Sequence, residues 1–166
     1  MSNKLQRVYQ LTRQVFNANV GLYDRGLYSR DKDWSFSLNA DRIIETKIPI
    51  KAAGCTSACK VFCKFARDIG LDCFVVCAAD VQGLHENNKT IHGHQFIAVD
   101  INGGLYGIDI LQDEPVPLFF IKKPGVGEKY KFDGRDHIVT AIIERDDIEK
   151  IDSYQKLRNL YVNGKI

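Results

Sequence analysis

The feature that most constrains the fold is the Asn102-Gly103 pair, which lies between two apolar runs at residues 94–101 and 105–110. Asn-Gly in this setting is the strongest short hairpin signal, because both residues tolerate the left-handed backbone that a two-residue turn requires. We therefore expect an antiparallel hairpin. A two-residue turn places Asp109 opposite Phe96, whereas a three-residue turn would move Asp109 to the other face of the sheet.

A long apolar stripe precedes this hairpin. Apolar residues recur at steps of three and four between Cys55 and Ile69, which predicts a buried helix. Gly70 is a good C-terminal stop for such a helix. The apolar and partly β-branched residues 73–78 (CFVVCA) then predict a buried strand.

The remaining patterns complete a single domain over residues 1–166. They predict an amphipathic helix at 4–17, irregular structure at 21–41, a short extended segment at 42–50, a polar loop at 79–93, strands at 118–121 and 138–143, and a closing helix at 146–161. The expected fold class is α+β, with one core helix packed on an antiparallel sheet.

Composition excludes several classes of protein. Apolar residues make up 45% of the 166 residues, which is typical of a globular chain rather than a disordered or fibrous one. No apolar run approaches the roughly 20 residues of a membrane span. Lys and Arg (23) nearly balance Asp and Glu (21) and are interspersed, so we expect neither nucleic acid nor a membrane as partner.

The N-terminus and the cysteines bear on the compartment. Residues 1–16 lack the continuous apolar core of a Sec signal peptide. The five cysteines are an odd number, and without a signal peptide we expect reduced thiols. The expected location is the cytoplasm, or outside the cell after export without a Sec signal.

Cys55 is the candidate nucleophile. It follows Gly54 and is expected in the first turn of the buried helix, where free backbone N–H groups stabilise a thiolate and can bind an oxyanion. A thiol hydrolase also needs a base and a group that orients it. In the expected register His94 and Asp109 are diagonal neighbours on one sheet face, roughly 7–8 Å apart at Cα, which suits those two roles.

These blocks resemble the transglutaminase-like (papain-like) superfamily. The stretch GCTSACKVFCKFARDIGLD from Gly54 is similar to the family's nucleophile helix, in which a cysteine opens a helix that ends in an Arg/Lys-x-x-Gly-Ile/Leu turn before a strand. GHQFIAV and GLYGID are similar to its His strand and its aromatic-x-x-Asp strand. The resemblance covers about residues 50–112. It implies the papain-like fold, with Cys55 as nucleophile, His94 as base and Asp109 as orienting carboxylate.

The chain departs from the family at three points. Gln95 replaces a small residue after the histidine, and Ile-Leu follows Asp109 where the family has Pro-Thr. The side chain that completes the family's oxyanion hole has no clear match. Trp34, Asn39 and Gln112 are candidates, and we assign Trp34 and Gln112 to substrate binding.

Other residues compete with this triad. Cys59 and Cys63 continue the stripe of Cys55, and Cys73 and Cys77 share one strand face, so all four are interpreted as packing residues. Three cysteines spaced C-x3-C-x3-C do not match a zinc site. His92 and Asp100 are rivals of His94 and Asp109. His92 is interpreted as a loop residue and Asp100 as a solvated carboxylate near the turn.

The sequence therefore predicts a thiol-dependent acyl-transfer enzyme that acts on amide bonds of protein or peptide substrates and needs no metal or cofactor. Hydrolysis, as a glutamine deamidase or a cysteine protease, is favoured because the chain is small. The alternatives are transglutaminase cross-linking, a non-catalytic binding module of the same fold, and a redox sensor that uses the clustered cysteines.

Overall fold

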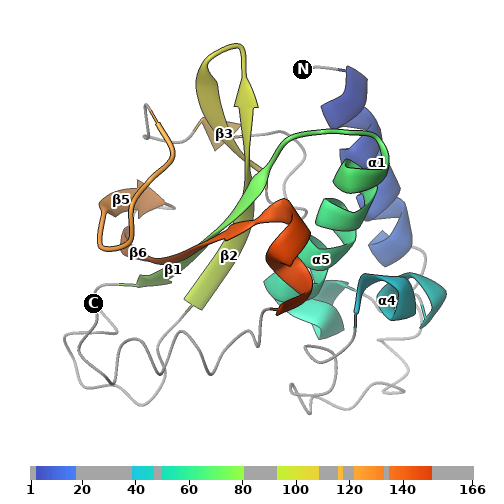
Figure 1. The fold of residues 1–166 in the computed structure, drawn as a ribbon. Coiled ribbons are helices and arrows are strands. Elements are labelled where there is room, and N and C mark those ends of the chain that lie inside the picture. Colours follow the sequence, from blue (N-terminus) through green and yellow to red (C-terminus); the bar gives the residue numbers. More distant parts are fainter. Residues whose placement is uncertain are drawn as a thin grey trace.

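The computed structural model describes residues 3–17, 39–46, 50–80, 93–108, 116–117, 122–132 and 135–150. The helices in this part are α1 (Asn3–Asn17), α4 (Ala40–Thr46), α5 (Ile50–Asp68) and the 3₁₀-helix η1 (Arg145–Lys150). The strands are β1 (Phe74–Asp80), β2 (Gly93–Ile101), β3 (Gly104–Ile108), β4 (Val116–Pro117), β5 (Lys129–Phe132) and β6 (Arg135–Glu144). The fold class is α+β, as predicted (Figure 1).

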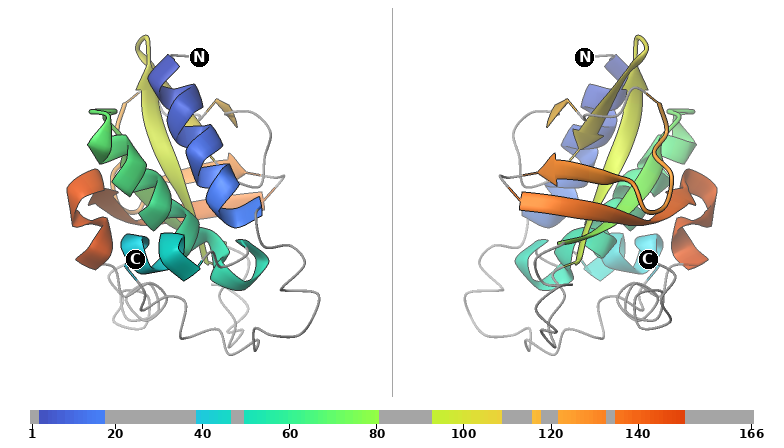
Figure 2. Two further views of the ribbon diagram at one scale, coloured as in Figure 1. Left: turned by 90° about the vertical axis from the view of Figure 1, so that its right-hand side faces the viewer. Right: turned by 90° about the vertical axis from the view of Figure 1, so that its left-hand side faces the viewer.

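The strands form one antiparallel sheet in the order β4-β3-β2-β1-β6-β5. Helices α1 and α5 lie side by side on one face, and the β5–β6 hairpin lies on the opposite side (Figure 2). Phe96 of β2 contacts Tyr130 of β5, with 6.0 Å between ring centroids, although β1 and β6 separate these strands in the sheet order. The sheet is therefore curled, and both of its faces bury side chains.

Each face has its own apolar core. The larger core joins the helices to the sheet, and its fully buried members include Leu5, Val8, Phe16, Ile43, Val61, Phe62, Cys63, Ala66, Val75 and Ile148. The smaller core lies within the curl of the sheet and contains Val76, Ala78, Phe96, Ala98, Tyr130 and Val139. Because side chains alternate along a strand, neighbouring residues of β1 and β2 belong to different cores.

The hairpin turn has the predicted two-residue form. Asn102 and Gly103 adopt φ values of 55° and 84°. The side chain of Asp100 accepts a hydrogen bond of 2.8 Å from the Gly103 N–H. The pairs between β2 and β3 run from Ile101–Gly104 to Ile97–Ile108, in the register that the sequence predicts.

The predicted extended segment at residues 42–50 is wrong. Residues 40–46 form helix α4, and Ile50 already belongs to α5. Asn39 is the cause, because its side-chain oxygen accepts the Arg42 N–H at 2.9 Å and its carbonyl accepts the Ile43 N–H at 3.1 Å. This is an N-cap followed by an acidic residue, Asp41, in the first turn.

Other boundaries also differ from the prediction. The predicted core helix begins at Ile50 instead of Cys55, because Lys51, Ala52 and Ala53 are good helix formers and no breaker precedes them in the helix. The predicted helix at 146–161 is a 3₁₀-helix over Arg145–Lys150, and the rest of that range lies outside the described residues. The predicted strand at 118–121 also lies outside them, while β5 was not anticipated.

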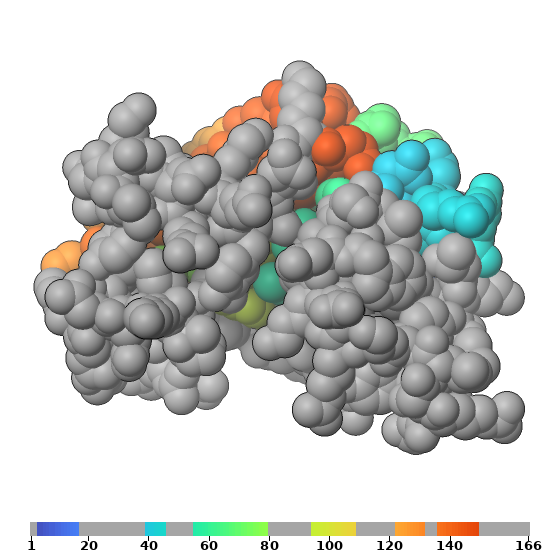
Figure 3. Space-filling view, turned by 90° about the horizontal axis from the view of Figure 1, so that it is seen from below, coloured from blue at the N-terminus to red at the C-terminus, as the bar shows by residue number. Residues whose placement is uncertain are grey.

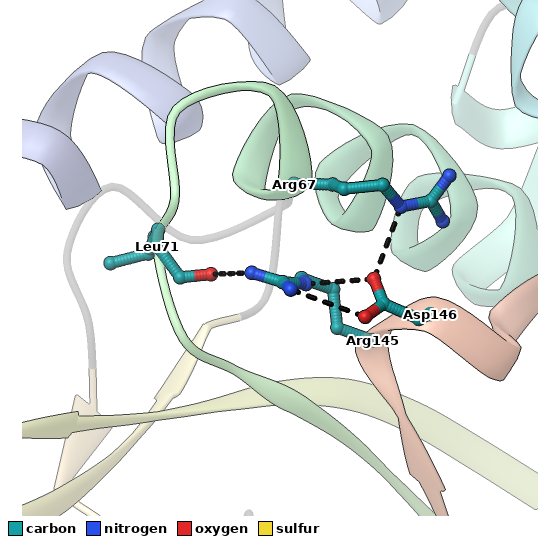
Figure 4. Close-up of polar contacts among 4 residues, drawn as sticks. All are labelled: Arg67, Leu71, Arg145 and Asp146. Atoms are coloured by element: carbon teal, nitrogen blue, oxygen red, sulfur yellow. Dashed lines mark hydrogen bonds and ion pairs between the residues drawn. The ribbon is translucent and has the colours of Figure 1, made fainter.

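The end of α5 is closed by Gly70 and by an ionic cluster. Gly70 has φ 64°, and the N–H of Leu71 donates to the Ala66 carbonyl at 2.8 Å. Arg145 donates to the Leu71 carbonyl at 2.9 Å, and Asp146 accepts from both Arg145 and Arg67 (Figure 4). The two arginines lower the pKa of Asp146. The cluster ties η1 to the turn that leads into β1.

A second ionic contact ties η1 to the helices. Glu149 accepts the Ala40 N–H at 2.9 Å, and its other carboxylate oxygen lies 3.9 Å from the Lys60 ammonium. Only 3% of the Lys60 side chain is exposed. One carboxylate therefore holds the start of α4 and the middle of α5 together.

Candidate active site

Cys55 lies in the second turn of α5, since the helix begins at Ile50. The prediction that it lies in the first turn of the helix is wrong. Because the free N–H groups of a helix belong to its first four residues, the backbone N–H of Cys55 is not one of them. All five cysteines are described, and Cys55 alone among them is not fully buried. Cys55 is therefore the one cysteine that retains partial exposure to solvent.

The other four thiols are packing residues, as predicted. Cys59, Cys63, Cys73 and Cys77 are buried in the core between α5 and the sheet. A hydrogen bond with Cys73, together with burial, raises the pKa of Cys63. Burial, with a further contribution from the neighbouring Cys55, raises the pKa of Cys77 to about 12. At neutral pH Cys63 and Cys77 are therefore protonated and are poor nucleophiles.

The beginning of β2 and Cys55 lie at the same end of the molecule. Helix α5 packs on β2, and Cys77 of β1, whose pKa responds to Cys55, pairs with Gln95 of β2. Viewed from below, atoms of α5 (teal) and of β2 (yellow-green), which pack on each other, are both visible between the grey atoms (Figure 3). The candidate site is the junction of α5, the end of β1 and the start of β2.

His94 faces the other way. It pairs with Ala78, and its ring stacks on Phe96 with 5.9 Å between ring centroids. Phe96 and Ala78 belong to the smaller core on the face turned away from α5. The structure thus places Cys55 and His94 on opposite faces of the sheet and does not bring these two predicted triad members together.

The remaining predicted site residues are placed as follows. Asp109 lies outside the described residues, and the observed register ends at the Ile97–Ile108 pair, just before it. Trp34 and Gln112 also lie outside the described residues, as does His92. Asn39 is an exposed helix cap, so its side chain already has a structural role.

Gln95, which the sequence marks only as a departure from the family pattern, is a further residue of this junction. It lies on the α5-facing side of β2, in line with Ile97 and Val99 of the larger core. Only 5% of Gln95 is exposed, and its Oε1 atom has no hydrogen-bond partner within the described part of the chain. The signal in the sequence was a polar residue in phase with an apolar strand face.

A second buried polar atom lies on β6, on the other side of β1 from Gln95. The β1–β6 register shifts between Cys77 and Ala78, so that Thr140 is the extra residue of a β-bulge. Thr140 is 1% exposed, and its hydroxyl has no hydrogen-bond partner among the residues described. Buried polar groups are normally hydrogen-bonded, so both atoms call for an explanation.

Two classes of feature are not found in the described ranges. They contain no group of three or more His, Cys, Asp or Glu side chains suited to holding a metal ion. None of their helices combines the length and the apolar character that crossing a membrane requires. Comparison with family models, with curated proteins and with solved structures gave no match for this chain.

Proposed function

We propose that the chain is a thiol-dependent enzyme that acts on amide bonds of protein or peptide substrates, with Cys55 as its nucleophile and a transglutaminase-like (papain-like) fold. The observation that carries the proposal is the contrast among the cysteines. One partly accessible thiol lies at the junction of α5, β1 and β2, whereas the other four are buried. The resemblance over residues 50–112 supports the same assignment.

The proposed reaction is acyl transfer. His94 takes the proton of Cys55, and the sulfur attacks the amide carbonyl carbon. The carbon–nitrogen bond then breaks, His94 returns the proton to the leaving nitrogen, and a thioester remains. Water releases the acid in a hydrolase, whereas an amine would give transglutaminase cross-linking. Asp109 holds the imidazole in the correct orientation.

This role of His94 requires a movement at the start of β2. The first two β1–β2 pairs, Ala79–Gly93 and Ala78–His94, must open so that the ring can turn around the strand end towards α5. At about 1 kcal/mol for each backbone hydrogen bond lost, the opening costs about 1–3 kcal/mol. A state of that energy is populated at about 0.6–16%, enough to support turnover.

The opposite-face placement favours a second candidate, a non-catalytic binding module of the same fold. Labelling with iodoacetamide near pH 6 separates the two. The enzyme predicts one fast-reacting thiol at Cys55, and His94→Ala removes that reactivity. His137→Ala is the matched control, because His137 also stacks in the smaller core, on Tyr130, but has no role in the reaction. Slow labelling of Cys55 that His94→Ala leaves unchanged contradicts the enzyme and supports the module.

Product analysis then identifies the reaction. Ammonia release from a glutamine-containing protein without a new N-terminus indicates a deamidase. A new N-terminus indicates a protease, and incorporation of an added amine indicates a transglutaminase. Cys55→Ala must abolish whichever product is found, or the activity does not belong to this site.

A further inference from the structure

Gln95 occupies an unusual position for a side chain with four hydrogen-bonding sites. Its strand face is otherwise apolar, it is 95% buried, and its Oε1 atom has no partner within the described residues. Burying an amide oxygen without a hydrogen bond costs about 1–3 kcal/mol. A Leu or Met at this position would avoid the cost, which indicates that the amide serves a ligand.

The geometry directs this amide towards the candidate nucleophile. Gln95 pairs with Cys77 across the β1–β2 ladder, and both side chains point to the face that α5 covers. Cys55 on α5 is close enough to Cys77 to affect its ionisation. A substrate carbonyl that contacts the Cys55 sulfur therefore lies near the Gln95 amide.

We infer that Gln95 recognises the primary carboxamide of a substrate glutamine or asparagine side chain. This inference rests on the proposed function, and it selects deamidation over peptide cleavage. The Gln95 oxygen accepts the substrate N–H that lies on the same side as the substrate oxygen, and the Gln95 N–H donates to that oxygen. Only a primary carboxamide has an N–H in that position. In a trans peptide bond a carbon atom occupies it, so a backbone amide cannot form both bonds.

The same contacts suit each stage of the reaction. The Gln95 N–H stabilises the charge that develops on the carbonyl oxygen when the carbon–sulfur bond forms. The carbon–nitrogen bond breaks and ammonia leaves with the proton that His94 returns. Water then attacks the thioester, the carbon–sulfur bond breaks, and the product is a carboxylate. A carboxylate offers no N–H to the Gln95 oxygen, so product release is favoured.

The test compares two peptide substrates that differ by one methyl group. One contains glutamine, and the other contains glutamine with a singly N-methylated side-chain amide, whose methyl group replaces the N–H that Gln95 accepts. For the wild-type chain we expect kcat/KM for the primary amide to exceed that for the methylated amide by about 100-fold or more, because a site built to hydrogen-bond a substrate N–H discriminates strongly against an analogue that lacks it. Gln95→Leu should reduce this ratio to below about 10.

Thr140→Val is the matched control, since it removes another buried polar group beside Cys77 and should leave the ratio unchanged. A merely structural role of Gln95 would lower both rates equally and preserve the ratio. Cys55-dependent turnover of both peptides at similar rates by the wild-type chain overturns the inference, even if Gln95→Leu does not fold. The absence of any Cys55-dependent turnover would instead contradict the proposed function.

Discussion

The contact between Lys60 and Glu149 gives a stability prediction in which the size of the loss depends on which partner is changed. The Lys60 ammonium is almost completely buried, whereas 37% of the Glu149 side chain is exposed. Glu149→Gln leaves the acceptor for the Ala40 N–H but removes the negative charge beside the buried ammonium. Lys60→Met removes the buried charge itself and keeps an unbranched side chain of similar volume.

The magnitude follows from the 3.9 Å separation. Two unit charges at that distance attract by about 4 kcal/mol at the effective dielectric constant of 20 that suits partly buried pairs. Because water reaches Glu149, we take about half of this value. Glu149→Gln should therefore lower the free energy of unfolding by about 2 kcal/mol and Tm by about 4–8 °C. Lys60→Met should cost less than about 1 kcal/mol, because replacing a buried charge by an apolar group is often neutral.

The assay is urea denaturation of both single variants and the double variant, followed by circular dichroism. The double variant should match Lys60→Met, since Glu149 has no buried charge to compensate once Lys60 is gone. Equal destabilisation by the two single variants, or no effect of Glu149→Gln, would show that the ion pair does not hold η1 to the helices.

Three further predictions concern stability. The pKa of Cys77 is raised from 9.0 to about 12, so its contribution is complete below pH 9 and lowers the free energy of unfolding by about 1.4 kcal/mol per pH unit between these values; urea denaturation at pH 8–11 should show at least this slope, because the pKa of Cys63 is raised as well, and Cys77→Ala should reduce it. Gly70→Ala should cost about 1 kcal/mol in thermal denaturation because Gly70 has a positive φ, whereas Gly125→Ala should cost less; equal costs would contradict the role of the backbone angle. Phe96→Ala should cost about 3–5 kcal/mol in urea denaturation, because its ring packs against Tyr130 in the smaller core; a loss below 1 kcal/mol would contradict that core.

Local signals in the sequence predicted local structure well. Asn102-Gly103 specified both the hairpin and its register, because the turn depends on two adjacent residues. The apolar stripe from Ala58 to Ile69 identified the core helix, because helical spacing is also a signal between residues that are close in the sequence. The error at α4 was also local, since Asn39 followed by Asp41 is a helix-start signal that was passed over.

The candidate site was harder to predict because it depends on which strand face meets α5. In β2, His94, Phe96 and Ala98 alternate with Gln95, Ile97 and Val99, and both sets contain apolar residues. The curl of the sheet gives each set its own core, so hydrophobicity alone could not assign His94 to a face. The curl brings Phe96 and Tyr130, which are distant in the sequence, into contact.

The most direct test of the account is to trap the nucleophile. A glutamine-containing peptide whose side-chain carboxamide is replaced by a chloromethyl ketone is incubated with the intact chain, and the modified residue is located by mass spectrometry. We predict a single adduct on Cys55, blocked by an excess of the unmodified peptide and absent in Cys55→Ala. Adducts distributed over several cysteines, or labelling that the unmodified peptide does not slow, would contradict a Cys55-centred amide-processing site.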